Sequence, residues 1–188
     1  MSSFYSIEEL KKLGIKEVGE EVYISKKASI YSPQNLKIGN HVRIDDFCIL
    51  SGNIEIGNYV HISAYVALYG KYGIKIKDFC GCSPRTTIFS ATDDFSGEYM
   101  ISPMVPEELT NVTGGVVTLE KYVQLGANTV VMPNITIGEG TSLGAMSFVN
   151  KSLEEWKIYA GIPCRYIKDR KKDVKELSKK INNDEGME

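Results

Sequence analysis

The strongest constraint on this chain is an aliphatic residue that recurs every six positions from Val18 to Val149. Seventeen of the eighteen lead positions are Ile, Leu or Val in a chain that is only 43% hydrophobic, and two-residue slips at 36–37 and 74–75 keep the phase. A period of six fits neither an amphipathic helix nor an alternating strand. It predicts short strands joined by corners, with three hexads in each triangular coil and about six coils stacked roughly 4.8 Å apart.

Other positions of the hexad support this all-β prediction. The residue four places after each lead is usually small or β-branched, and glycine often follows the lead directly, as at Gly39 and Gly126. Glycine serves where the backbone bends sharply or is approached closely. Cys48, Cys80 and Cys82 fall on inward positions, so we expect buried thiols, not disulfides or zinc ligands.

Three segments depart from the period. Residues 6–13 begin with a capping box and predict a short helix. The stretch 94–116 is a long excursion after the fourth coil, and such insertions often carry function. We therefore expect an N-terminal helical cap over 1–17, a β-helix over 18–167, and a C-terminal helix and tail over 168–188.

Charge and hydropathy exclude several classes of partner. Twenty-two basic and 24 acidic residues give a formal net charge of -2, which does not provide the positive field of a nucleic-acid-binding protein. No apolar stretch approaches about 18 residues, and the first residues lack the layout of a signal peptide. We expect a cytoplasmic protein with no membrane or nucleic-acid partner and no bound metal.

Several motifs resemble the hexapeptide-repeat acyltransferases over residues 18–170. They are Gly-Ala-Asn-Thr-Val-Val-Met-Pro-Asn, Gly-Ala-Met-Ser and Tyr-Ala-Gly-Ile-Pro-Cys-Arg. Ala-Thr-Asp-Asp-Phe-Ser-Gly-Glu-Tyr, Leu-Thr-Asn-Val and Trp-Lys-Ile-Tyr-Ala-Gly-Ile-Pro are similar to the sugar O- and N-acyltransferases of surface-polysaccharide synthesis. The resemblance implies a left-handed parallel β-helix and a homotrimer, with coenzyme A in the groove between neighbouring prisms and the long loop reaching over the active site.

Two columns of small residues are the candidate contact for coenzyme A. Stacking by coil pairs Gly126 with Gly144 and Ala127 with Ala145. Such a strip offers bare backbone to an extended pantetheine arm, although small residues also permit tight corners. The resemblance places the cofactor phosphates at the basic residues that follow, for which a solvated tail is the alternative: Arg165, Lys168, Arg170 and Lys171.

The catalytic candidates on the coils are His61 and Ser83. Aligning equivalent hexad positions on successive coils places His61 between Arg43 and Gly81, and it predicts that His61 and Ser83 are neighbours at one corner. A histidine can accept a proton at working pH, although an exposed histidine often has no such role. We expect His41 to lie in the middle of a face and to be less suited to catalysis.

The candidates on the long loop are three carboxylates, Asp93, Asp94 and Glu98. Related maltose and galactoside acetyltransferases carry a catalytic histidine on this loop, and this chain has none there. A carboxylate is a poor base for a sugar hydroxyl, but it can hold an amino sugar's ammonium group and accept its proton. Caps and solvated charges are the alternative interpretation of these residues.

We therefore expect an acyl-CoA-dependent N-acyltransferase that acts on a nucleotide-linked amino deoxysugar, with an acetyl or short hydroxyacyl donor. Transfer would be direct, with a backbone N–H near Ser83 stabilising the oxyanion and no cysteine acyl-enzyme. A sugar O-acetyltransferase and a non-catalytic β-helical binding protein are the alternatives. A γ-type carbonic anhydrase needs three histidines for zinc, and the chain has two.

Overall fold

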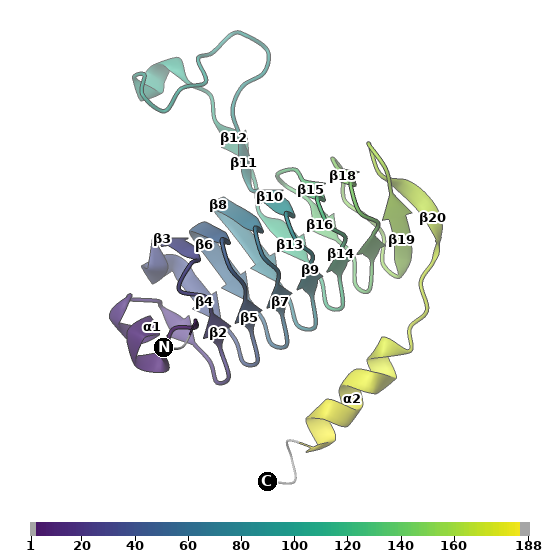
Figure 1. Cartoon of the computed structure of the whole chain (residues 1–188). Helices are drawn as coiled ribbons and strands as arrows, with labels where there is room; N and C mark the ends of the chain where they lie inside the picture. Colours follow the sequence, from purple (N-terminus) through teal and green to yellow (C-terminus); the bar gives the residue numbers. More distant parts are fainter. Residues whose placement is uncertain (1–2, 185–188) are drawn as a thin grey trace.

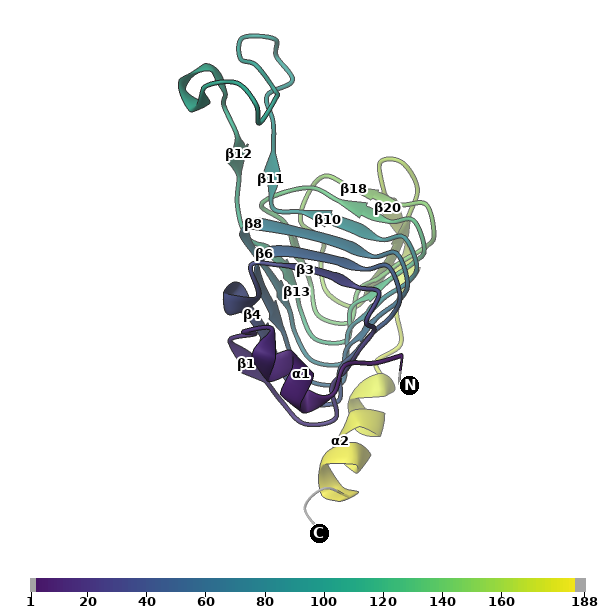
Figure 2. The ribbon, with the colours of Figure 1, turned by 60° about the vertical axis from the view of Figure 1, so that its left-hand side comes forward.

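The computed structural model describes residues 3–184, so residues 1–2 and 185–188 of the two expected terminal segments lie outside the described residues. The chain winds into a parallel β-helix with a triangular cross-section. Figure 1 shows the coils side by side along the prism, and Figure 2 shows the triangle close to end-on.

Each coil contributes one short strand to each of three faces. Face 1 contains β1 (Glu17–Val18), β4 (Leu36–Ile38), the end of β6 (Ile49–Ile56), the end of β8 (Ala67–Ile76), β13 (Val117–Leu119) and β16 (Thr136–Ile137). Face 2 contains β2 (Tyr23–Ile24), β5 (Arg43–Ile44), β7 (His61–Ile62), β9 (Gly81–Cys82), β14 (Gln124–Leu125), β17 (Ser142–Leu143) and β19 (Lys157–Ala160). Face 3 contains β3 (Ser29–Tyr31), the starts of β6 and β8, β10 (Thr87–Phe89), β15 (Val130–Val131) and β18 (Phe148–Val149).

The number of coils agrees with the repeat. The eighteen leads make six coils, and β19 adds a seventh parallel strand to the described part of face 2. The chain then reverses, because β20 (Arg165–Asp169) pairs antiparallel with β19.

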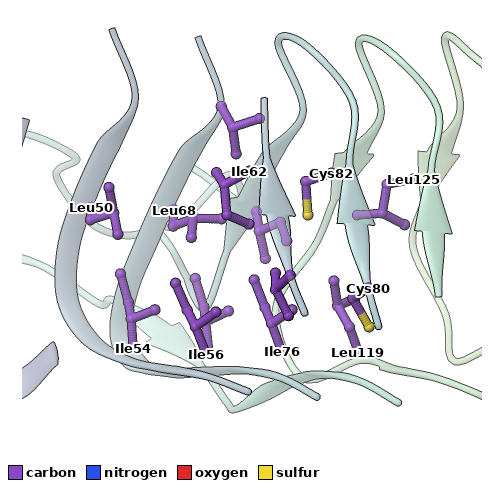
Figure 3. Close-up of a cluster of buried hydrophobic side chains, with 14 of the residues drawn as sticks. Leu50, Ile54, Ile56, Ile62, Leu68, Ile76, Cys80, Cys82, Leu119 and Leu125 are labelled. Atoms are coloured by element: carbon purple, nitrogen blue, oxygen red, sulfur yellow. The ribbon is translucent and has the colours of Figure 1, made fainter. Parts of the chain in front are cut away.

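The leads fill the inside of the prism, as predicted. Sixteen of the eighteen are buried, and Val18 and Ile30 at the first coil are partly buried against the same core. Figure 3 shows leads from successive coils stacked in rows, with Cys80 and Cys82 among them. At about 25 cal/mol per Å² of buried apolar surface, this continuous column is the main source of stability.

The sharp bends lie three residues after a lead, not directly after it. At this position eleven non-glycine residues of the described chain adopt the left-handed region; among them His41, Tyr65 and Arg85 have φ of 55°, 63° and 61°. The glycine after the lead has another role, since a Cβ on Gly126 would lie 2.6 Å from the backbone N of Ala145. Glycine is therefore required at this position because neighbouring coils approach closely, and not because the backbone bends there.

Three additions complete the fold. Helix α1 (Ile7–Lys12), with its capping box at Ser6, lies at the N-terminal end of the prism and buries Leu10. Between β10 and β13 the chain leaves the corner between faces 3 and 1 on an antiparallel stem, β11 (Ala91–Thr92) with β12 (Thr113–Gly114). We call residues 93–112 the arm; it contains the 3₁₀ turn η2 (Glu107–Leu109). A second such turn, η1, spans Pro33–Asn35.

Helix α2 (Val174–Asp184) follows β20 and returns along the outside of the prism. It is attached near the corner between faces 1 and 2, where the Ser178 and Tyr122 hydroxyls are 2.8 Å apart and Lys175 pairs with Glu139 at 2.9 Å. None of the described helices is long and apolar enough to cross a membrane.

Candidate active site

A column of outward-facing residues on face 2 is the centre of the candidate site. The strand register pairs Arg43 with His61, His61 with Gly81, and Gly81 with Gln124. This confirms Arg43 and Gly81 as the predicted neighbours of His61. The predicted corner position is wrong, because His61 lies within β7 on the face, whereas His41 lies at a corner. The bends follow three residues after the lead, which places the residue before each lead in mid-strand.

His61 is held by a carboxylate that the sequence did not single out. Its Nε2 lies 2.7 Å from Asp45 Oδ2, and Arg43 Nε donates to Asp45 Oδ1 at 2.8 Å. Partial burial pushes the pKa of Asp45 upward, but the hydrogen bonds from Arg43 and His61 outweigh it, so the pKa of this carboxyl lies below its ordinary value. Asp45 is therefore an ionised bridge between two nitrogen donors.

Ser83 follows β9 at the edge of face 2 and contacts a second side chain that sequence reasoning missed. Gln124 Nε2 donates to Ser83 Oγ at 3.2 Å. The amide reaches Ser83 by lying over Gly81, where a Cβ would be only 2.5 Å from Gln124 Oε1. Among the described hydrogen bonds His61 has Asp45, and not Ser83, as its partner. The two candidates thus lie on either side of the Gln124 amide, which covers Gly81. We call the surface formed by His61, Gln124 and Ser83 the niche.

The expected oxyanion donor, a backbone N–H near Ser83, does not fit the structure. The N–H groups of Ser83, Arg85 and Thr86 donate to the carbonyls of Leu125, Ala64 and Ser83, at 3.0, 3.2 and 3.2 Å. These N–H groups are therefore already used in hydrogen bonds between coils and within the corner turn, and they are not available to an oxyanion. The donor available at this edge is instead the Ser83 hydroxyl, because the Gln124 amide already donates to Ser83 Oγ and to the Leu125 carbonyl, at 3.2 and 3.4 Å.

The strip of small residues is present in the predicted columns. Leu125 pairs with Leu143, so Gly126 lies beside Gly144 on the next coil, and Met146 N donates to Ala127 O at 2.8 Å. Stacking alone explains Gly126, as described above. The N–H groups of Ala127 and Ala145, however, have no acceptor among the described residues. They remain available to a ligand.

The basic residues beyond the strip separate into two groups. Arg165 and Lys168 are exposed on β20. Arg170 is half-buried, and its Nη1 donates to the carbonyls of Tyr122 and Gly140 at 2.8 and 2.9 Å. Its guanidinium therefore fastens the segment before α2 to the corner of the prism.

The arm carboxylates do not form a single cluster. Asp93 is exposed and lines a cavity of about 560 Å³ at the base of the arm, together with Lys71, Tyr72 and Glu107. Asp94 accepts hydrogen bonds from Ser96 and the Gly97 N–H, and the bond from Ser96 is the main reason that the pKa of Asp94 lies below its ordinary value. The Asp94 carboxylate therefore stabilises the turn in which it lies.

Glu98 is exposed further along this turn, and its backbone N–H donates to Ser96 Oγ at 3.1 Å. Of the three carboxylates, Asp93 alone lines the cavity at the arm's base.

The thiols are unsuited to carrying an acyl group. Cys48, Cys80 and Cys82 are buried as predicted. Burial raises the pKa of Cys48 to about 11 and that of Cys80 to about 12, and it raises the pKa of Cys82 further. A thiolate, the nucleophilic form, is thus strongly disfavoured.

Comparison with known proteins agrees with this geometry. A family model described as bacterial transferase hexapeptide (six repeats) matches residues 35–70 and 117–151. The chain is 42% identical over 172 residues to dTDP-4-amino-4,6-dideoxy-D-glucose acyltransferase of Escherichia coli, covering 90% of each chain. This chain belongs to the hexapeptide-repeat acyltransferases.

Two further relatives narrow the comparison. The structure of AntD, an N-acyltransferase from Bacillus cereus in complex with dTDP and 3-hydroxybutyryl-CoA, is 52% identical, with a TM-score of 0.96 over 99% of this chain and 100% of that one. A putative lipopolysaccharide biosynthesis O-acetyl transferase of Escherichia coli is 28% identical, over 81% of this chain and 78% of its own. The predicted left-handed β-helix and acyltransferase family are confirmed.

Within this acyltransferase fold, the sequence predicted His61 and Ser83 as site residues but not the side chains that contact them, Asp45 and Gln124. Asp45 follows its lead directly, so the hexad period marks it as an outward polar residue like many others. Gln124 is equally unremarkable in sequence. The register pairs His61 with Arg43, two residues before Asp45, and pairs Gln124 with Gly81, two residues before Ser83. Both contacts are therefore diagonal between neighbouring coils, and the sequence carries no direct signal for them.

Proposed function

We propose that this chain is an acyl-CoA-dependent N-acyltransferase that transfers a short acyl group to the amine of a dTDP-linked amino deoxysugar, in the cytoplasm. The observation that carries this proposal is near full-length similarity to a dTDP-4-amino-4,6-dideoxy-D-glucose acyltransferase, at 42% identity, and to the N-acyltransferase AntD, at 52% identity, one structure of which contains dTDP-4-amino-4,6-dideoxyglucose and coenzyme A. The arm supports it, because residues 93–112 contain carboxylates and no histidine. Amine acylation needs an oriented, deprotonated amine and not a base strong enough for a hydroxyl.

The position of two residues favours a homotrimer with composite sites. Ser83 precedes face 3 of its coil, and Asp93 directly follows β11, the stem strand that rises from the far corner of that face (Figure 2). A face of about six extended residues is roughly 20 Å wide, so one amine cannot contact both residues of one chain. A head-to-tail ring of three prisms would bring Asp93 of one subunit to the Ser83 edge of the next.

Spacing in the relative supports the same pair. The serine and the aspartate that are substituted in several AntD structures are ten residues apart in their own chain. In this sequence Ser83 is the one serine that is followed by an aspartate ten residues later. We therefore give Ser83 and Asp93 the roles of groups around the reacting amine.

Coenzyme A would lie along the strip on the C-terminal side of Ser83. The open N–H groups of Ala127 and Ala145 would bind amide oxygens of the pantetheine arm, and exposed Arg165 and Lys168 would pair with phosphates. No metal is required by this chemistry.

The chemistry balances without a covalent enzyme intermediate. Asp93 holds the substrate ammonium and accepts one proton from it, which then passes to water; the neutral amine attacks the thioester carbon. The Ser83 hydroxyl, whose oxygen accepts from the Gln124 amide, offers its hydrogen to the developing oxyanion. As the C–N bond forms and the C–S bond breaks, the second amine proton passes to the departing thiolate, giving the amide and free coenzyme A.

The test is a coenzyme A release assay with acetyl-CoA or 3-hydroxybutyryl-CoA and dTDP-4-amino-4,6-dideoxyglucose. We expect turnover with the amino sugar, and a loss of about a hundredfold or more in Asp93→Asn. The matched control is Asp94→Asn, which we expect to retain most of the activity. Turnover with simple glycosides but not with the amino sugar would instead identify an O-acetyltransferase, and no binding of either coenzyme A or dTDP would indicate a non-catalytic protein.

A further inference from the structure

The niche on face 2 contains an Asp–His pair whose geometry has a specific consequence. Asp45 Oδ2 lies 2.7 Å from Nε2 of His61, and its side chain is only 20% exposed, whereas the imidazole is 53% exposed. An ionised carboxylate can only accept hydrogen bonds, so Nε2 must carry the proton of the neutral ring. The other nitrogen, Nδ1, then holds the lone pair.

The lone pair on Nδ1 has no hydrogen-bond donor among the described residues, and the ring is half exposed. On the side of the preceding coil lie Arg43 on β5 and Asp45 directly after it. On the side of the following coil, β9 presents Gly81, which is covered by the Gln124 amide that donates to Ser83. A small polar group at the niche would contact the imidazole on one side and the Gln124 and Ser83 side chains on the other.

Arg43 fixes the carboxylate itself. Its Nε donates to Oδ1 at 2.8 Å, which directs Oδ2 toward His61. The arrangement is therefore a chain of three groups, in which a guanidinium orients a carboxylate and the carboxylate orients an imidazole. Such outer partners set the tautomer and the charge preference of a functional histidine.

Resting on the proposed function, we infer that Asp45 is a positioning residue: it holds His61 in the Nε2–H tautomer, so that Nδ1 accepts the proton of the acceptor amine. The proton moves from the amine to Nδ1 as the C–N bond forms, Asp45 stabilises the resulting imidazolium, and Nδ1–H then returns the proton to the thiolate as the C–S bond breaks. No co-reactant beyond the two substrates is needed.

The substitution Asp45→Asn gives a sharp test because Arg43 remains. Arg43 Nε needs an acceptor, so the new amide will place its oxygen there and present its NH₂ group to His61 Nε2. That reverses the tautomer and places a hydrogen on Nδ1, which can then no longer accept a proton. We expect kcat to fall about a hundredfold, with KM for both substrates within about twofold of wild type.

The chain offers a matched control. His41 Nδ1 pairs with Glu21 Oε2 at 3.1 Å at a neighbouring corner, so Glu21→Gln makes the same chemical change beside the other histidine. With two histidines in the sequence, ¹⁵N NMR can follow both tautomers directly. We expect Asp45→Asn to reverse the tautomer of His61 alone, and Glu21→Gln to leave kcat unchanged.

The outcomes separate this inference from the proposed function. A reversed His61 tautomer with unchanged kcat would overturn the role of Asp45, and so would a tautomer that does not respond. If the wild-type enzyme acylates no nucleotide-linked amino sugar, the proposed function fails, and the NMR result alone then shows whether Asp45 sets the tautomer. A parallel loss of kcat in His61→Asn would support the inference.

Discussion

Arg170 has two possible roles, and its removal distinguishes them. The sequence places it among the residues for the cofactor phosphates, whereas in the structure its guanidinium holds two backbone carbonyls at 2.8 and 2.9 Å. In Arg170→Ala those carbonyls lose a charged donor. Because the site is half-exposed, water can replace part of the interaction, so we take the low end of the usual range, about 1 kcal/mol for each bond and about 2 kcal/mol in total.

For a chain of this length, 1 kcal/mol corresponds to about 2–4 °C in Tm, so we expect a decrease of about 4–8 °C. Thermal unfolding followed by circular dichroism measures the shift, and acyl-CoA kinetics measure the alternative role. The control is Arg165→Ala on exposed β20, for which we expect an unchanged Tm and a raised KM for acyl-CoA. The opposite pattern, with Arg170→Ala raising KM at an unchanged Tm, would refute the structural role.

Three further changes probe the niche, the pH dependence and the core. Gly81→Ala should lower kcat with little effect on Tm in a thermal melt, because its Cβ would displace the flexible end of Gln124. Burial pushes the pKa of Asp78 upward, but hydrogen bonds, first that from Lys121, hold it below the ordinary value; its contribution to stability is therefore present above about pH 4 and lost in more acid solution. Melts at pH 7 and pH 3 should show a smaller difference for Asp78→Asn than for wild type. Burial raises the pKa of Cys80 to about 12, so a thiol reagent should label it in urea but not in the native protein, as mass spectrometry will show.

The fold could be predicted because each hexad has the same pattern of inward and outward residues. A lead such as Ile62 must be inside, and inward positions repeated along the chain allow one closed arrangement in which all of them stack. The positions of the bends could not be read in the same way. Glycine after the lead was compatible with a bend or with close approach, and the structure shows that Gly126 is needed for close approach, whereas bulky residues such as Tyr65 adopt the left-handed conformation at the bends.

The candidate site was harder to predict because it depends on side-chain reach. Aligning equivalent hexad positions correctly placed Arg43 and Gly81 on either side of His61. It could not show that Asp45 turns toward His61, since rotamers and hydrogen-bond partners are set by neighbours on adjacent coils. The proximity of three acidic residues in the arm sequence was also misleading, because Asp94 bonds its own turn.

Subunit mixing provides the decisive test of the composite site. If Ser83 from one subunit and Asp93 from the next act together, then Ser83→Ala and Asp93→Asn each inactivate every site of their own trimer. The two variants are unfolded, mixed in equal amounts and refolded together. A site in the mixed trimer is intact when its Ser83 comes from an Asp93→Asn subunit and its Asp93 comes from a neighbouring Ser83→Ala subunit. Random assembly of a ring makes this combination at about one site in four, so we expect about a quarter of wild-type activity. Either variant refolded alone is the control and should stay inactive. If both residues served a site within one chain, every site in the mixture would lack one of them and no activity would return.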